Sequence, residues 1–430
     1  MPVQVKPSKA TVAEQTLAPG SPKRAKWSWR MRTIKTAGGV LAMASVIVFV
    51  CAGALAIDPG PVTASRILFS GDSNIYTFKI FPQRPIVASR SVSVLDQGPQ
   101  ASLPDTVSFS YGGSQFTANM PDLFARTRTQ AFVIVRNDRV IYESYMNGAG
   151  RDTVFTSFSM AKSFTSALIG IAIDDGRITS VDDPLIKYLP ELQNRGFDSL
   201  TLYDMLRMST GIAFKQDADV FLLLQPFQDD DSRQFYTDNL RRLLFSVQRS
   251  DEPVGTGFRY NDYYALLEGL ILQRVAGESV AQYTQDSLWQ PMGMEYPASW
   301  SLDSTADGLE KTNTGLNARA IDFARIGLMY LHNGRWNGRQ IISQNWVTES
   351  TTPDPTDQRP WFNSVSWPPN GGYYKYQWWG LTNSDGTYDY MAWGKDGQWL
   401  YVSPSTKTVV VRLGEGDQFN PWPRPLRFVP

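Results

Sequence analysis

The chain has 430 residues, of which 42% are hydrophobic and 19% charged, so it can fold around a sizeable core as one large domain or two ordinary ones. Its 41 lysines and arginines balance its 41 aspartates and glutamates, which excludes the basic excess expected of a nucleic-acid-binding protein.

The N-terminal region has the pattern of a membrane-targeting segment. Residues 1–35 are polar and become basic near their end, and residues 36–57 carry no charge. A stretch of roughly 20 such residues can span a bilayer, and the preceding cations keep the N-terminus in the cytoplasm. We therefore predict a transmembrane anchor at 36–57 with the rest of the chain exported, to the periplasm or another extracytoplasmic space. Cleavage after Ala54-Leu55-Ala56, a small-x-small site, is the alternative and would give a secreted protein.

Residues 58–120 contain scattered proline, serine and glycine without a long periodic helix, and we predict an extended lead-in that packs on the main domain. The main domain, 121–430, opens with a hairpin of the strands Ala131–Val135 and Val140–Tyr145. Phe158–Asp175 follows with apolar residues three and four apart, the pattern of a helix, and Gly176 ends it.

The middle of the chain, to about residue 345, is mostly helical in pattern. Strands return near the C-terminus at Trp399–Val402 and Thr408–Val411. Strands, a long helical insert and then further strands that complete the same sheet predict an α+β architecture, an antiparallel sheet flanked by helices with a helical subdomain.

The chain contains one cysteine and one histidine. Cys51 lies within the apolar segment, so no intramolecular disulfide can form. His332 lies at the end of a predicted helix before Gly334, where a surface position is expected. These scarcities predict a site that works without histidine, and we expect neither a metal nor an organic cofactor.

Ser159 and Lys162 stand three residues apart, one turn of the predicted helix from each other. A serine in the first turn lies beside free backbone N–H groups and the positive end of the helix dipole, which favour negative charge on an attacked carbonyl oxygen. Burial of Lys162 would favour its neutral form, which could accept the serine proton. An ordinary helix-capping serine with a surface lysine would have the same spacing. The apolar residues that follow favour the buried, catalytic interpretation.

Two later segments could complete such a site. Tyr260 lies in Gly257–Asp262, and a phenol beside a lysine ammonium can relay a proton. Ala392–Gln398 is rich in glycine and leads into a predicted strand, where a substrate could approach the backbone and receive a second oxyanion hydrogen bond. Taken alone, the first segment is better explained by a structural tyrosine and the second by a glycine-rich β-turn.

Taken in order, these segments resemble the serine β-lactamase and penicillin-binding-protein superfamily. The pattern is most similar to the esterases and amidases related to class C β-lactamases, 6-aminohexanoate-dimer hydrolases among them. The resemblance covers roughly residues 120 to 415 and is carried by five blocks. These are Tyr142–Tyr145 with Phe155–Ser163, Leu200–Gly211, Phe258–Tyr260 with Leu266–Leu267, Ala318–Gly327 and Gly394–Gln398.

The resemblance implies a β-lactamase/transpeptidase-like fold and a serine hydrolase that forms an acyl-enzyme. It implies that Ser159 is the nucleophile and that Lys162 and Tyr260 together act as general base and then as acid. The backbone N–H groups of Ser159 and Lys395 would form the oxyanion hole.

Two departures from the family pattern bear on the substrate. The Tyr-x-Asn motif reads Tyr260-Asn261-Asp262, and an aspartate cannot donate the amide hydrogen bond of asparagine. If Gly394 is the glycine of the family's Lys-Thr-Gly motif, which we prefer, Ala392 replaces the lysine that would hold a β-lactam carboxylate. If Lys395-Asp396-Gly397 is the counterpart, the lysine survives and Gln398 supplies the oxyanion N–H. Efficient β-lactamase activity is not expected.

The leading hypothesis is hydrolysis of a small amide or ester. Besides Asp262 and Gly394, substrate-binding candidates are the aromatic residues Trp300, Tyr374 and Trp379, although aromatic side chains also form cores. The alternative is a membrane-anchored sensor or binding protein that is acylated at Ser159 and turns over slowly or not at all.

Overall fold

The computed structural model describes most of the chain beyond its N-terminal segment. The described ranges are 60–111, 114–215, 229–305, 307–361, 371–416, 421–423 and 426–427. The predicted membrane segment at 36–57 lies outside them. Within these ranges, no helix is both long and apolar enough to cross a bilayer.

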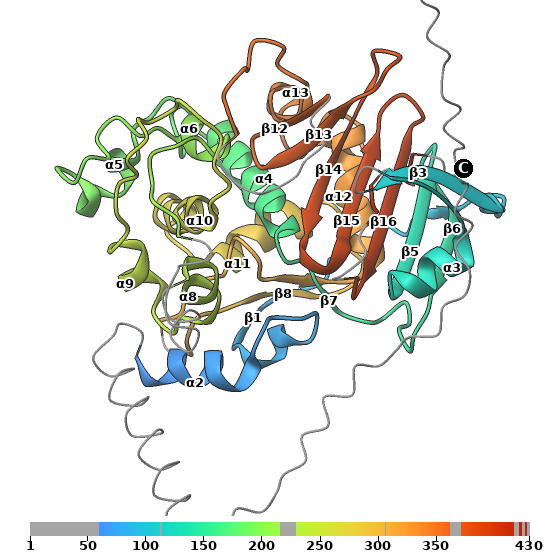
Figure 1. The fold of residues 1–430 in the computed structure, drawn as a ribbon, viewed down its shortest axis with the longest axis horizontal. Coiled ribbons are helices and arrows are strands. Elements are labelled where there is room, and N and C mark those ends of the chain that lie inside the picture. The colour runs from blue at the N-terminus through green and yellow to red at the C-terminus, as the bar shows by residue number, and fades with distance from the viewer. Residues whose placement is uncertain are drawn as a thin grey trace, which may run out of the picture.

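An eight-stranded sheet forms the centre of the molecule, in the order β12-β13-β14-β15-β16-β5-β6-β2 (Figure 1). Its strands, in that order, are Gly372–Lys375, Trp378–Thr382, Tyr388–Gly394, Gln398–Ser403, Thr408–Gly414, Thr129–Arg136, Arg139–Tyr145 and Asp96–Gln97. Neighbouring strands are antiparallel except β2 and β6, which are parallel. The predicted hairpin is β5–β6, and Asn137 and Asp138 both have positive φ at its turn, as a tight two-residue hairpin requires.

Helices α4 (Met160–Asp174) and α12 (Ala320–Leu331) pack against this sheet, α4 on β14 and β15 and α12 on β15, β16 and β5. All residues of β15 and β16 are buried, which explains their nearly continuous apolar runs. Gly327 lets α12 approach closely, because a methyl group there would lie 2.6 Å from a side-chain carbon of Val409. Residues 160–172 of α4 are all buried, so this helix lies inside the molecule.

A helical part lies on the other side of α4, where α10 (Asp262–Ala276) packs against it (Figure 1). Asn261 caps α10 by accepting a hydrogen bond from the Tyr263 N–H, and Gly277, with φ of 73°, ends it. The shorter helices around α10 are α5 (Leu185–Tyr188), α6 (Leu202–Leu206), α8 (Asp230–Tyr236), α9 (Leu240–Leu244) and α11 (Val280–Thr284). The predicted α+β architecture is therefore confirmed.

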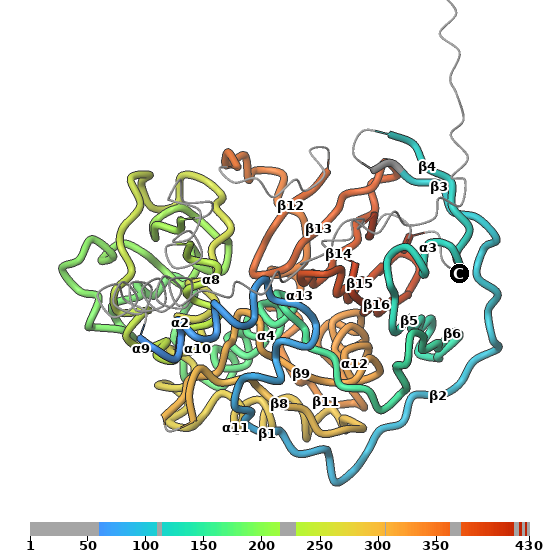
Figure 2. Tube along the Cα trace, turned by 60° about the horizontal axis from the view of Figure 1, so that its bottom comes forward, coloured from blue at the N-terminus to red at the C-terminus, as the bar shows by residue number. Residues whose placement is uncertain are grey.

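The predicted lead-in is more structured than expected. It contains α2 (Pro61–Ser70), the hairpin of β3 (Thr106–Tyr111) and β4 (Ser114–Asn119), and β1 (Gln83–Ile86). β1 belongs to a second sheet, of order β1-β8-β9-β7, with β8 (Ala298–Ser301), β9 (Leu316–Ala318) and β7 (Phe155–Thr156). Figure 2 shows this N-terminal stretch in blue, running from α2 past β1 toward β2.

Candidate active site

Ser159 follows the short strand β7 and directly precedes α4. Phe158 has φ of 45°, a left-handed conformation that is uncommon for a bulky residue and turns the chain sharply before the helix. Ser159 occupies the N-cap position but its side chain makes no capping hydrogen bond. Instead, the Ser159 Oγ accepts a hydrogen bond of 2.8 Å from the Lys162 Nζ. The geometry is therefore not that of an ordinary capping serine with a surface lysine.

Lys162 is almost completely buried, with 1% of its surface exposed. Its Nζ lies 2.5 Å from the Asp262 Oδ1 and also donates to the Asn313 carbonyl at 3.1 Å. Burial is the largest influence and lowers the pKa of Lys162, but Asp262 and, after it, Tyr260 raise the pKa, and the net shift is upward. Burial therefore favours neutral Lys162, as expected, but its neighbours favour the ammonium form.

Tyr260 lies beside this pair. The Lys162 Nζ is 4.9 Å from the centre of the Tyr260 ring, and the phenol interacts with both Lys162 and Ser159. Burial raises the pKa of Tyr260, the Lys162 charge opposes this, and the net shift is upward. The fold thus brings Tyr260, about 100 residues further along the chain, into one cluster with Ser159 and Lys162.

Two amide side chains, which the sequence did not single out, hold Asp262 in place. The Gln234 Nε2 on α8 donates to the Asp262 Oδ2 at 2.8 Å. The Asn313 Nδ2 in turn donates to the Gln234 Oε1 at 2.5 Å. Asp262 was predicted to bind substrate. In the structure its carboxylate instead pairs with the Lys162 ammonium. The contacts of Gln234 and Asn313 join distant segments, so no local sequence pattern indicates them.

The cluster opens into a cleft of about 590 Å³. Its aromatic walls are Phe158, Phe235, Tyr236 and Tyr260. One side of it is formed by the N-terminal segment, through Ile67 and residues 71–73. An aromatic cleft was predicted, but apart from Tyr260 its aromatic residues and this N-terminal wall were not identified from the sequence.

The three aromatic residues predicted to bind substrate do not line this cleft. Trp300 is fully buried on β8, where its indole N–H donates to the Thr284 Oγ1. Trp379 stacks on the Tyr260 ring at a centroid distance of 5.6 Å, and Tyr374 packs edge-on against both. Tyr374 and Trp379 are each 3% exposed and therefore support Tyr260 from behind. Trp300, Tyr374 and Trp379 thus do not form the cleft wall as predicted. The number of aromatic residues in a sequence does not show which face of a strand each ring occupies.

Gly394 ends β14 against the turn that carries Ser159. A methyl group added there would lie 2.3 Å from the Ser157 carbonyl oxygen and 3.1 Å from the Phe158 Cβ. Only glycine permits this approach, which places Lys395 in the lining of the same cleft as Ser159. The backbone N–H of Gln398 already donates to the Lys395 carbonyl. The geometry therefore favours Lys395 over Gln398 as the second oxyanion donor.

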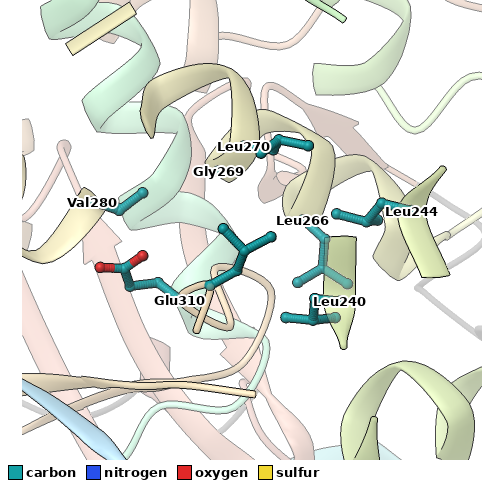
Figure 3. Close-up of a pocket in the computed structure, with 8 residues that line it drawn as sticks. Leu240, Leu244, Leu266, Gly269, Leu270, Val280 and Glu310 are labelled. Carbon is teal, nitrogen blue, oxygen red and sulfur yellow. The ribbon is translucent and has the colours of Figure 1, made fainter. Parts of the chain in front are cut away.

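A smaller hollow lies away from this cleft, between α9, α10 and the start of α11 (Figure 3). Leucine side chains from α9 and α10 line it, together with Val280 and Glu310, and it has no room for a water molecule. It is a packing defect of the core, so the cleft at Ser159 is the better candidate for a substrate site.

Comparison with known proteins matches residues 117–424 to the family model described as Beta-lactamase. The chain is 28% identical over 323 residues to the 6-aminohexanoate-dimer hydrolase of Paenarthrobacter ureafaciens, a match that covers 71% of this chain and 76% of that protein.

Among solved structures, a Bacillus anthracis protein assigned provisionally as a 6-aminohexanoate-dimer hydrolase has a TM-score of 0.68 at 24% identity, covering 80% of this chain and 88% of that one. An octameric penicillin-binding-protein homologue from Pyrococcus abyssi has a TM-score of 0.53 at 19% identity, covering 70% and 73%. These likenesses confirm the predicted type of fold.

Proposed function

Because the chain belongs to the β-lactamase family of hydrolases, we propose that it cleaves a small amide or ester through an acyl-enzyme on Ser159. One observation carries this proposal: the Lys162 ammonium lies 2.8 Å from the Ser159 Oγ, in a buried cluster that opens into the cleft. A buried, oriented lysine beside a serine hydroxyl is an arrangement that activates a nucleophile.

Lys162 and Tyr260 act together as the base. Because both pKa values are raised, the reactive form is the one in which the coupled pair has lost one proton. As the Ser159 Oγ bonds to the substrate carbonyl carbon, its proton passes to this pair and restores the resting protonation state. When the tetrahedral intermediate collapses, the bond to the leaving nitrogen or oxygen breaks and the pair returns the proton to it. Water then cleaves the acyl-enzyme by the same steps.

The backbone N–H groups of Ser159 and Lys395 form the oxyanion hole in this proposal. Among the hydrogen bonds of the described residues, neither N–H has an acceptor within the protein. Two backbone donors beside the first turn of α4 would stabilise the negative oxygen of the intermediate.

The substrate is proposed to be small, in keeping with the cleft volume of about 590 Å³. The relative at 28% identity is named as a hydrolase of a 6-aminohexanoate dimer. Ala392 is buried in β14 and carries no charge for a β-lactam carboxylate. We therefore propose an amidase or esterase that is at most a poor β-lactamase.

A sensor that is acylated but deacylates slowly is the second candidate. It is favoured by one observation, the Lys162–Asp262 pair, because a lysine held as an ammonium is a weak base toward the deacylating water. A burst of product equal to the enzyme concentration, with little turnover afterwards, would identify the sensor.

We further propose that residues 36–57 anchor the protein and that the domain from about 58 onward is exported. The uncharged segment ends four residues before α2, whose Leu68 and Phe69 are 53% and 88% exposed. These apolar side chains fit a position beside a bilayer. Fractionation tests the anchor: the full chain should remain in membranes after a high-salt wash. A soluble product with a new N-terminus near residue 57 would indicate a cleaved signal instead.

The first experiment on the reaction uses residues from about 59 onward and a panel of chromogenic short-chain esters, anilides and one cephalosporin. Ser159→Ala should lose nearly all turnover. Ser232→Ala, which alters another serine of the same cleft, is the matched control and should retain it. Equal activity in wild type and Ser159→Ala would contradict the proposal.

A further inference from the structure

Lys395 is the one basic side chain among the described residues that line the cleft. Its ammonium makes three contacts with the N-terminal segment: 2.6 Å to the Asp72 Oδ1, 2.7 Å to the Ser73 carbonyl and 3.0 Å to the Ser73 Oγ. A lysine ammonium at such a place is otherwise a natural partner for a substrate carboxylate. Here its hydrogen-bonding capacity is already filled by the protein.

The segment that presents Asp72 is tied to the body of the protein at several points. The Tyr236 hydroxyl donates to the Gly71 carbonyl at 2.8 Å. Thr63 and Asp238 exchange two hydrogen bonds between α2 and the loop after α8. The Arg66 guanidinium donates to the Asp303 carbonyl at 2.8 Å. These contacts fix the segment beside Lys395, while the Asp72 side chain itself is 89% exposed to solvent.

The remaining charged residues of the lining have the same sign as Asp72. Asp229 and Asp231 also line the cleft, as does Asp262, whose charge is paired with Lys162. A substrate carboxylate in this cleft would meet several like charges, and it would have to displace Asp72 to reach the ammonium of Lys395. Like charges brought together disfavour binding, and solvent limits the effect here because the side chains of Lys395 and Asp72 are 38% and 89% exposed.

We propose that Asp72 acts as a charge selector: by occupying Lys395 it makes the enzyme prefer acyl groups without a carboxylate over otherwise similar acyl groups that carry one. The inference rests on the proposed function and narrows its substrate class. Asp72 and the Lys395 side chain take no part in bond breaking, so they determine selectivity and not the chemical step.

The test compares two 4-nitrophenyl esters of similar size, the neutral butyrate and the anionic monosuccinate. The measured quantity is the ratio of their kcat/KM values, anionic over neutral. Asp72→Asn should raise this ratio by about two- to fivefold, because an exposed charge pair is worth at most about 1 kcal/mol and about 1.4 kcal/mol is tenfold. This increase in the ratio should be smaller at high salt, and it should be absent in the double variant Asp72→Asn/Lys395→Met.

Asp231→Asn is the matched control, since it removes one negative charge from the same cleft but leaves the contact with Lys395. An unchanged ratio in Asp72→Asn, or an equal gain in Asp231→Asn, would overturn the proposal. If wild type cleaves neither ester, it is the proposed function that fails. Calorimetric binding of succinate to Ser159→Ala with and without Asp72→Asn then tests charge selection without catalysis, and equal affinities would overturn it.

Discussion

The Asp262 carboxylate lies 2.5 Å from the Lys162 ammonium, and both side chains are almost completely removed from solvent. A buried ion pair of this kind holds the lysine in its charged form, whereas a lysine must release a proton to act as a base. Asp262 therefore places a condition on the proposed reaction: the cluster must lose a proton before Ser159 can be activated.

Replacing Asp262 should change the pH dependence of the reaction. Because Asp262 raises the pKa of Lys162, the wild-type kcat/KM should increase with pH into the alkaline range. Asp262→Asn removes the largest contribution that raises the pKa of Lys162, and burial, which lowers this pKa, remains. The rise of kcat/KM should therefore occur at lower pH in the variant. The measurement is kcat/KM from pH 5 to 10.5 in both proteins. Superimposable profiles would show that Asp262 does not control the base.

Removing the Tyr260 hydroxyl should impair catalysis with little effect on folding. The ring of Tyr260→Phe still packs on Trp379 and Tyr374, but the shared proton loses one of its carriers. We expect kcat to fall by about 10²- to 10⁴-fold, the usual contribution of a general acid–base group, with a nearly unchanged Tm. Tyr374→Phe is the control, because its hydroxyl donates only to Gln377 and lies outside the cluster. Similar losses in the two variants would argue against a role for the Tyr260 proton.

Enlarging Gly394 should disturb the oxyanion hole. The added methyl group in Gly394→Ala would overlap the Ser157 carbonyl, so β14 and the Lys395 N–H must move away from Ser159. Loss of one oxyanion donor costs about 10²- to 10³-fold in kcat, and we expect a decrease of this size. Gly60→Ala, where the nearest atom to the new methyl is 4.0 Å away, controls for the loss of a glycine. A fully active Gly394→Ala enzyme would exclude the Lys395 N–H from this role.

Glu268, buried in α10, should make the stability of the protein depend on pH. Burial raises its pKa from 4.5 to about 8, although Gln377 donates a hydrogen bond to it. Between these two values the native state keeps a proton that the unfolded state releases, so the free energy of unfolding should fall as pH rises through this window. At about 1.4 kcal/mol per pH unit as an upper bound, the loss amounts to a few kcal/mol.

Glu268→Gln keeps the shape and the hydrogen bond but cannot ionise. Urea unfolding at pH 5, 6.5 and 8 should show the wild type losing stability across the series and the variant losing less of it. Parallel decreases in the two proteins would mean that other groups cause the pH dependence.

Much of the fold and of the reactive cluster could be predicted from the sequence. The β5–β6 hairpin and α4 are encoded by local periodicity, and a separation of three residues on a helix suffices to place Lys162 beside Ser159. Tyr260 and Gly394 lie far from Ser159 in the sequence, so residue spacing alone could not place them at the site. The order of the family motifs indicated that they belong there.

The partners of these residues could not be predicted, for a physical reason. Asp262 pairs with Lys162 because Gln234 and Asn313 fix its carboxylate, and those contacts exist only once α8 and the segment before β9 have packed. From the sequence, Trp300 and Trp379 cannot be distinguished from aromatic residues that line a cleft. Only their positions in the two sheets show that they are buried.

The wall formed by Ile67 and residues 71–73 lies outside the region matched by the family, which begins at residue 117. The cleft at Ser159 therefore extends beyond the part of the chain that the family model matches. A chain shortened to the matched region would keep Ser159, Lys162 and Tyr260 but would lose one side of the cleft and leave the Lys395 ammonium without Asp72. Exchange of the N-terminal segment between relatives could thus alter substrate preference in one step while the acyl-transfer residues stay the same.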